Sequence, residues 1–103
     1  MTNVFEVIDK SGRRVHLSNE RWKHIRKKHP EIQDFEQIKE TIQKPDKITS
    51  YNYDETVYYD ETIYYFYKYY KNRPLSYRYL LVAVKYLNGE GYVATAYFSA
   101  KIK

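Results

Sequence analysis

The sequence contains no cysteine, which excludes disulfide bonds and thiolate metal sites. No apolar run approaches the roughly 18 residues that a membrane-spanning helix needs. The first ten residues, MTNVFEVIDK, lack the basic, apolar and small-residue regions of a secretory signal. No repeat, linker or low-complexity tail interrupts the 103 residues, which suffice for one modest core. We therefore expect a single soluble, cytoplasmic domain over residues 1–103, without a membrane partner.

Several catalytic motifs are missing as well. There is no glycine-rich phosphate loop, no Gly-x-Ser-x-Gly nucleophile elbow and no cysteine nucleophile. His24 and His29 are five residues apart, which does not stack them on one helical face, and no carboxylate joins them at ligand spacing. His16, on the preceding strand, is most simply a surface residue. We therefore expect no metal and no cofactor, which leaves general acid–base chemistry supported by cations.

Positive charge and tyrosine are abundant. The formal net charge is +5, which favours nucleic acid, anionic lipid or an acidic partner. The stretch RWKHIRKKHPE, residues 21–31, holds five cations and two of the three histidines. The 14 tyrosines suit strands, and a tyrosine can also stack on a base and hydrogen-bond a phosphate. Such groups suit RNA cleavage, because the 2′-hydroxyl of RNA is an internal nucleophile that needs only a base, an acid and cations.

The N-terminal half predicts a hairpin and two helices. Strand-like segments on either side of a polar turn predict a hairpin over residues 4–17. Ser18 is a suitable N-cap for a helix over residues 19–28. Pro30 biases His29 out of the α region, so His29 is expected at the end of this helix. Asp34 with Gln37 predicts a capping box for a second helix, which Pro45 closes.

The chain after Pro45 reads as strands. The segments 47–53 and 56–60 are weak candidates, 62–71 is a strong one, and 76–87 and 91–100 are the strongest. Residues 77–86 are apolar on both alternating faces near their middle, which is typical of a central strand covered by a helix on one side. The predicted fold class is α+β, with two N-terminal helices packed on a twisted antiparallel β-sheet.

The connection between the last two strands has two possible registers. Asn88-Gly89 predicts a two-residue turn, whereas a three-residue loop, 89–91, would place Gly91 in the left-handed conformation as a bulge. The two registers place Lys85 on opposite faces relative to Thr95. We favour the longer loop, which sets Lys85 directly across from Thr95.

Four motifs in order resemble the phage-associated branch of the Barnase–EndoU–colicin–RelE-like (BECR) nucleases. A basic helix carries W-x-H-I-x-x-x-H-P-E over residues 22–31, and I-x-x-T-I-x-x-P-x-x-I follows over residues 38–48. The strand Y-L-L-V-A-V-K occupies residues 79–85, and G-Y-V-A-T-A-Y occupies residues 91–97. The resemblance covers nearly the whole chain from Leu17 to Lys101. It implies a small α+β domain that cuts RNA without a metal, in a family whose members are often toxins or effectors held by an inhibitory protein partner.

The resemblance also assigns site residues. His24 and His29 match the helix histidines, Lys85 matches the strand lysine, and Thr95 and Tyr97 match the polar positions of T-A-Y. Lys28 precedes His-Pro, where the family often has arginine, and lysine keeps the charge without the bidentate fork. Arg26 is added because it shares a helix side with Trp22 and His29. The predicted site residues are therefore catalytic His24, His29, Lys85, Thr95 and Tyr97, and substrate-binding Arg26 and Lys28.

Each of these residues also has a structural explanation. His24 is an exposed helical histidine, His29 can hydrogen-bond the helix end, and Arg26 can pair with Glu31 instead of substrate. Lys85 stands in an apolar strand, where a charge needs an edge, a partner or a cleft. The rival hypotheses are a nucleic-acid-binding module without catalysis and a protein-interaction domain, such as one half of a toxin–antitoxin pair. The nuclease hypothesis requires the first helix and the last strands to share a cleft, and it fails if Lys85 lies on the far side of the sheet.

Overall fold

The computed structural model describes residues 2–52 and 62–102, and its elements confirm an α+β fold. The predicted strand at 56–60 lies outside the described residues. Within them, no helix is long and apolar enough to cross a membrane. The elements are β1 Asn3–Ile8, β2 Arg14–Ser18, α1 Asn19–Lys28, α2 Phe35–Gln43, β3 Lys47–Asn52, β4 Thr62–Tyr69, the 3-10 helix η1 Leu75–Tyr77, β5 Tyr79–Leu87 and β6 Glu90–Ser99.

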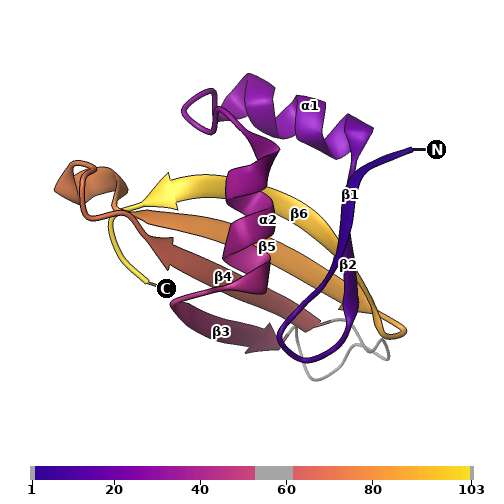
Figure 1. Ribbon diagram of the computed structural model, residues 1–103. Coiled ribbons are helices and arrows are strands. Elements are labelled where there is room, and N and C mark those ends of the chain that lie inside the picture. Colours follow the sequence, from indigo (N-terminus) through magenta and orange to yellow (C-terminus); the bar gives the residue numbers. More distant parts are fainter. Residues whose placement is uncertain (1, 53–61, 103) are drawn as a thin grey trace.

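The sheet is mixed, not antiparallel throughout as predicted. Its six strands lie in the order β1-β2-β6-β5-β4-β3. The N-terminal hairpin joins the sheet through β2, which runs parallel to β6 and pairs residues 14–16 with residues 90–92 (Figure 1). Two parallel strands are joined by a crossover connection and not by a tight turn. Here both helices and three strands lie between β2 and β6 in the sequence. No local sequence signal specifies such a long-range pairing.

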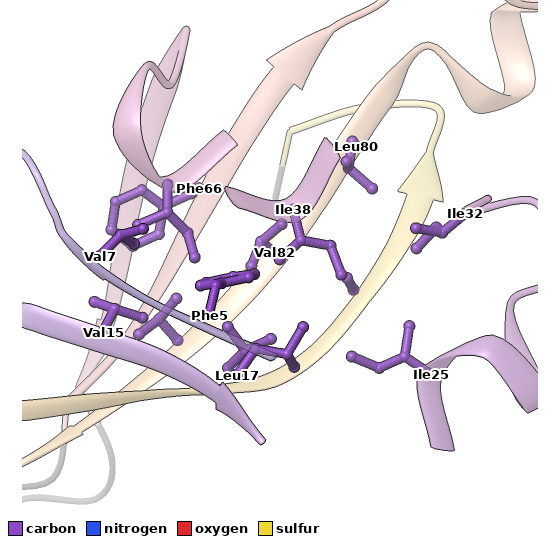
Figure 2. Close-up of a cluster of buried hydrophobic side chains, with 14 of the residues drawn as sticks. Phe5, Val7, Val15, Leu17, Ile25, Ile32, Ile38, Phe66, Leu80 and Val82 are labelled. Carbon is purple, nitrogen blue, oxygen red and sulfur yellow. The ribbon is translucent and has the colours of Figure 1, made fainter. Parts of the chain in front are cut away.

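The central strand β5 separates two buried clusters. Leu80, Val82 and Val84 belong to the larger one, which also includes Ile25 of α1 and Ile38 of α2 (Figure 2). All five side chains are 0–1% exposed. Strand residues two apart share a face, so this cluster defines the face of β5 that is turned toward α2.

The opposite face of the sheet carries a smaller cluster of Tyr67, Leu81 and Ala83. We call this side the tyrosine face, because partly buried tyrosines from three strands pack against the cluster: Tyr65, Tyr79 and Tyr97. Alternation along β5 places Lys85 on the tyrosine face too, since Val84 and Tyr86 belong to the larger cluster.

Helix α1 has the predicted bounds. The Ser18 hydroxyl accepts a hydrogen bond from the Arg21 N–H (3.1 Å), which caps the start. At the other end His29 is the C-cap, with φ −133° and ψ 68°, and its N–H donates to the Ile25 carbonyl (2.7 Å). Strand β2 pairs only with residues 90–92 at the start of β6. Helix α1 follows β2 directly and contacts β6, which continues past that pairing (Figure 1).

Helix α2 begins at the predicted N-cap but without the predicted capping box. The Asp34 carboxylate accepts a hydrogen bond from the Glu36 N–H (3.0 Å). A capping box would also need the Gln37 side chain to accept from the cap residue, yet Gln37 Oε1 is buried and has no hydrogen-bond partner among the described residues. The hydrogen bond that the Gln37 side chain does form is with the side chain of Tyr70, just after β4, so Gln37 joins α2 to the end of that strand and does not cap the helix.

The favoured three-residue loop between β5 and β6 is wrong. Asn88 and Gly89 both have positive φ (54° and 82°), so the connection is the two-residue turn. Gly91 is required for space and not for its φ, because an added Cβ would lie 2.8 Å from Cε1 of Tyr86 and 3.0 Å from Cγ2 of Val15. Lys85 accordingly lies across from Tyr92 and not from Thr95.

A β-bulge further along β6 changes which residues share a face. Val84 lies across from Val93, whereas Ala83 lies across from Thr95, so Ala94 is the additional residue. Residues directly opposite each other point to the same side of a sheet. Thr95 therefore lies on the face of Ala83 and Lys85, as expected, although the register that puts it there differs from the predicted one.

Candidate active site

Lys85 lines a pocket of about 360 Å³ to which three separate parts of the chain contribute charged or aromatic side chains. Arg21 comes from the first turn of α1, His16 from β2 and Tyr92 from β6. We call it the Lys85 pocket. Its lining residues are His16, Ser18, Arg21, Lys85, Tyr92, Val93 and Ala94.

The pairing of β2 with β6 brings His16 into this pocket. Val15 and Leu17 are fully buried, so alternation turns His16 to the other side of β2. The parallel register then pairs His16 with Tyr92, and their rings meet edge to face with centroids 5.2 Å apart. Lys85 lies across from the same tyrosine, on β5. Tyr92 thus has an imidazole on one neighbouring strand and an ammonium on the other.

His24 lines a second pocket, of about 340 Å³, together with Ser18, Glu20 and Arg21. We call it the His24 pocket. Ser18 and Arg21 line both pockets, so the two adjoin at the start of α1. Arg21 is exposed there and lines one pocket with a histidine from β2 and the other with a histidine from α1. Two imidazoles and two cations therefore border one connected surface.

His29 lies near the other end of β6. Its ring and that of Tyr97 have centroids 5.6 Å apart at an angle of 32°. Its Nδ1 lies 3.5 Å from Oε1 of Glu31, which lines a further pocket of about 300 Å³ with Arg73 and Tyr77. The structure therefore brings His29 and Tyr97 together, as one pair of the predicted site.

The remaining predicted residues are more dispersed. Thr95 is half-buried on the tyrosine face, across from Ala83. Lys28 is exposed in the last turn of α1. The Arg26 guanidinium lies 5.7 Å from the centroid of the Trp22 ring, and Arg26 lines neither the Lys85 pocket nor the His24 pocket. The alternative pairing of Arg26 with Glu31 is not observed, because Glu31 contacts His29 instead.

A pocket between the first helix and the last strands exists, but the helix residue that lines it is Arg21 and not one of the predicted site residues. Lys85 lies on the face of β5 turned away from α2, so the nuclease hypothesis fails in the form that groups Lys85 with the histidines on the helix side of the sheet. Helix α1 lies beside β6, however, and its Arg21 lines the same pocket as Lys85. The N-terminal basic segment thus reaches the Lys85 pocket through Arg21, whereas His29 of the same segment contacts Tyr97 further along β6.

Sequence reasoning missed His16, Arg21 and Tyr92 as site residues. The Asn88-Gly89 turn, read as a two-residue loop, puts Tyr92 across from Lys85, so one signal for Tyr92 was present. His16 had no such signal, because its place depends on the pairing of β2 with β6.

A buried carboxylate anchors β5 next to Lys85. Asp9, at the end of β1, accepts hydrogen bonds from the Tyr86 hydroxyl, the Ser11 N–H (2.8 Å) and hydroxyl (2.6 Å), and the Arg13 N–H (3.0 Å). Burial raises the pKa of Asp9, but these hydrogen bonds together outweigh it and hold the pKa below its ordinary value of 3.8. Burial, then the hydrogen bond and charge of Asp9, raise the pKa of Tyr86. Asp9 is therefore a carboxylate and Tyr86 a neutral donor at neutral pH.

Among residues 2–52 and 62–102, no three histidine, aspartate or glutamate side chains gather closely enough to hold a metal ion. The chain matches, over residues 4–103, the family described as phage-Barnase-EndoU-ColicinE5/D-RelE like nuclease2, and it belongs to that family. No curated protein and no solved structure matches it. The family resemblance drawn from the four motifs is confirmed, and the chain is a member of a nuclease family.

Proposed function

We propose that the protein is an endoribonuclease with a BECR-like fold that cleaves RNA without a metal ion, by attack of the 2′-hydroxyl on the adjacent phosphate. Membership of a nuclease family supports the general class of activity. The observation that carries the mechanism is that His16, Arg21 and Lys85, from three elements, line one pocket. This arrangement offers a phosphate two cations and a proton carrier at the same place.

The chemistry needs one group to remove a proton and another to supply one. One imidazole takes the proton of the 2′-hydroxyl as the O2′–P bond forms, and the other gives a proton to the O5′ oxygen as the P–O5′ bond breaks. The products are a 2′,3′-cyclic phosphate and a 5′-hydroxyl. His16 and His24 suit these roles because Arg21 borders both of their pockets. Either histidine can serve as base or acid.

Arg21 and Lys85 suit the stabilisation of charge on the transferring phosphate. The guanidinium presents a planar fork of donors that matches two phosphate oxygens, whereas the ammonium acts as a point charge. Preorganised cations stabilise charge that develops in the transition state, and such groups supply much of the rate enhancement in many enzymes. Thr95 lies on the same face as Lys85, and we assign it the role of orienting a nucleotide. Lys28 adds to the positive potential that draws RNA to α1.

The test uses a synthetic single-stranded RNA of twelve nucleotides in buffer with EDTA. We expect cleavage that leaves 2′,3′-cyclic phosphate ends, detected by mass spectrometry, and none when every nucleotide is 2′-deoxy. Lys85→Ala is expected to lower kcat about 100-fold. Lys47→Ala, which removes an exposed lysine from the far edge of the sheet, serves as the matched control. Equal cleavage of the deoxy strand, loss of activity with EDTA, or no cleavage of several RNA sequences at low salt would contradict the proposal.

A further inference from the structure

Two histidine–tyrosine pairs lie along β6. Near the start of the strand, the ring of Tyr92 contacts that of His16 from β2, with centroids 5.2 Å apart. Toward the end, the ring of Tyr97 contacts that of His29 at the end of α1, at 5.6 Å. Both tyrosines are half-buried, so each ring keeps an accessible part.

The β-bulge puts both tyrosines on the same face. Tyr92 and Tyr97 are five residues apart, and in a regular strand an odd separation points two side chains to opposite sides. Here Tyr92 lies across from Lys85 and Tyr97 across from Leu81, which are four residues apart on β5 and therefore share a side. The additional residue Ala94 accounts for the difference. The bulge thus aligns two aromatic rings that the regular pattern would separate.

The residues between the two rings are small, and the Tyr92 end of this span lies next to the charges of the proposed site. Ala94 and Thr95, both small, are the residues between Tyr92 and Tyr97 on this face. Four residues of strand span about 13 Å, too far for one base to bridge but within reach of a short oligonucleotide. Lys85 and Arg21 stand at the Tyr92 end, so the positive charge lies where the chain of phosphates would enter.

We propose that this face of β6 is a track for single-stranded RNA, in which His29 and Tyr97 hold a base some nucleotides away from the cleaved phosphate. The proposal rests on the proposed function and gives it a substrate class. Aromatic rings hold single-stranded nucleic acid by stacking on base faces, which a duplex hides inside its helix. The positive charge at one end of the track complements the phosphate backbone. His29 and Tyr97 thereby act in substrate binding at a distance from the reacting atoms.

The experiment measures kcat/KM for a dinucleotide and for a twelve-nucleotide single strand that contains the same cleavage step. In the wild type the longer RNA is preferred, and a duplex of the same sequence is cut poorly. Tyr97→Leu lowers the ratio of the two kcat/KM values about 10-fold, because loss of one stacked base weakens only the longer substrate's extra contact. His29→Gln lowers the same ratio and replaces Tyr97→Leu if that variant fails to fold. Tyr69→Leu, an exposed tyrosine on β4 of the same face, is the matched control and leaves the ratio unchanged.

The outcomes separate this inference from the proposed function. Cleavage with an unaltered length ratio in both variants, or equal cleavage of single strand and duplex, overturns the track while the nuclease stands. If no RNA is cleaved, the proposed function fails, and binding of fluorescein-labelled strands decides the inference. Tighter binding of twelve nucleotides than of four, weakened about 10-fold by Tyr97→Leu and not by Tyr69→Leu, then supports the track. Binding that is insensitive to length or to Tyr97 overturns it.

Discussion

The hydroxyl of Tyr86 donates a hydrogen bond to the buried carboxylate of Asp9 and so joins β5 to the end of β1. The Arg13 guanidinium covers the same tyrosine ring, 3.7 Å from its centroid. Tyr86 is the neighbour of Lys85, and Asp9 holds the turn that leads into β2. This link therefore connects the two hairpins whose pairing brings His16 beside Tyr92.

Removal of the Tyr86 hydroxyl is expected to destabilise the fold. Tyr86→Phe takes one of several donors from a carboxylate whose side chain is 1% exposed. A hydrogen bond to a charged group contributes about 1.5–3 kcal/mol, so the free energy of unfolding should fall by that amount in urea titrations. Tyr69→Phe, which removes an exposed hydroxyl that accepts from Arg78, is the control and should change it by about 0.5 kcal/mol or less. Equal stabilities of Tyr86→Phe and the wild type would show that the link contributes nothing.

The same carboxylate predicts a loss of stability in acid. The pKa of Asp9 in the folded protein lies below its ordinary value of 3.8, so below about pH 4 the unfolded chain binds this proton more readily than the folded one. The stability that Asp9 contributes is present above that pH and is lost as the pH falls through the lower, folded-state pKa. The difference in unfolding free energy between the wild type and Asp9→Asn should therefore shrink as the pH is lowered from 6 toward 2. A difference that stays constant or grows over this range would be the contrary result.

Gly91→Ala should be costly for steric reasons. The new Cβ would lie 2.8 Å from Tyr86, which is itself buried and hydrogen-bonded to Asp9 and so has little room to move. Overpacking of this kind costs about 1–3 kcal/mol, measured as a lower urea midpoint. The double variant Gly91→Ala with Tyr86→Leu should cost less than the sum of the two single changes, because the smaller side chain leaves space for the methyl group. Strict additivity would mean that the contact with Tyr86 is not the cause.

Two arginines of α1 should differ in their effect on cleavage. Arg21 lines both the Lys85 and the His24 pocket, whereas Arg26 lies over the Trp22 ring outside both. Arg21→Ala should lower kcat/KM for RNA about 100-fold through loss of a phosphate contact. Arg26→Ala removes the same charge from the same helix, and screening of an exposed charge should limit its effect to about fivefold. If Arg26→Ala lowered kcat/KM more than Arg21→Ala, the result would favour the predicted site that places Arg26 with Trp22 and His29 on one side of α1.

Local signals in the sequence predict the elements well. Ser18 and the His29-Pro30 pair define α1 because a cap hydrogen bond and a proline act on their own neighbours. Lys85 matches the strand lysine of the family motif, and its charge in an apolar strand predicts an edge, a partner or a cleft; it does line a pocket.

The arrangement of the elements depends on contacts that no local pattern reveals. The pairing of β2 with β6 joins distant segments, so neither the mixed sheet nor the place of His16 beside Tyr92 follows from the sequence. The β-bulge at Ala94 decides which side chains of β6 share a face, but an alanine gives no sequence signal for a bulge. The predicted longer loop is wrong because Gly91 is needed for close packing against Tyr86, and the sequence alone does not distinguish this need from a need for positive φ.

The central claim is that phosphate binds where His16, Arg21 and Lys85 meet. The most direct measurement is an NMR titration of the ¹⁵N-labelled protein with a 2′-O-methyl RNA of twelve nucleotides, which binds but lacks the attacking hydroxyl. We expect the largest amide shifts at His16, Arg21, Lys85 and Tyr92, with weaker shifts continuing along β6. Shifts confined to α2 or β3, with the residues of the Lys85 pocket unmoved, would contradict the account.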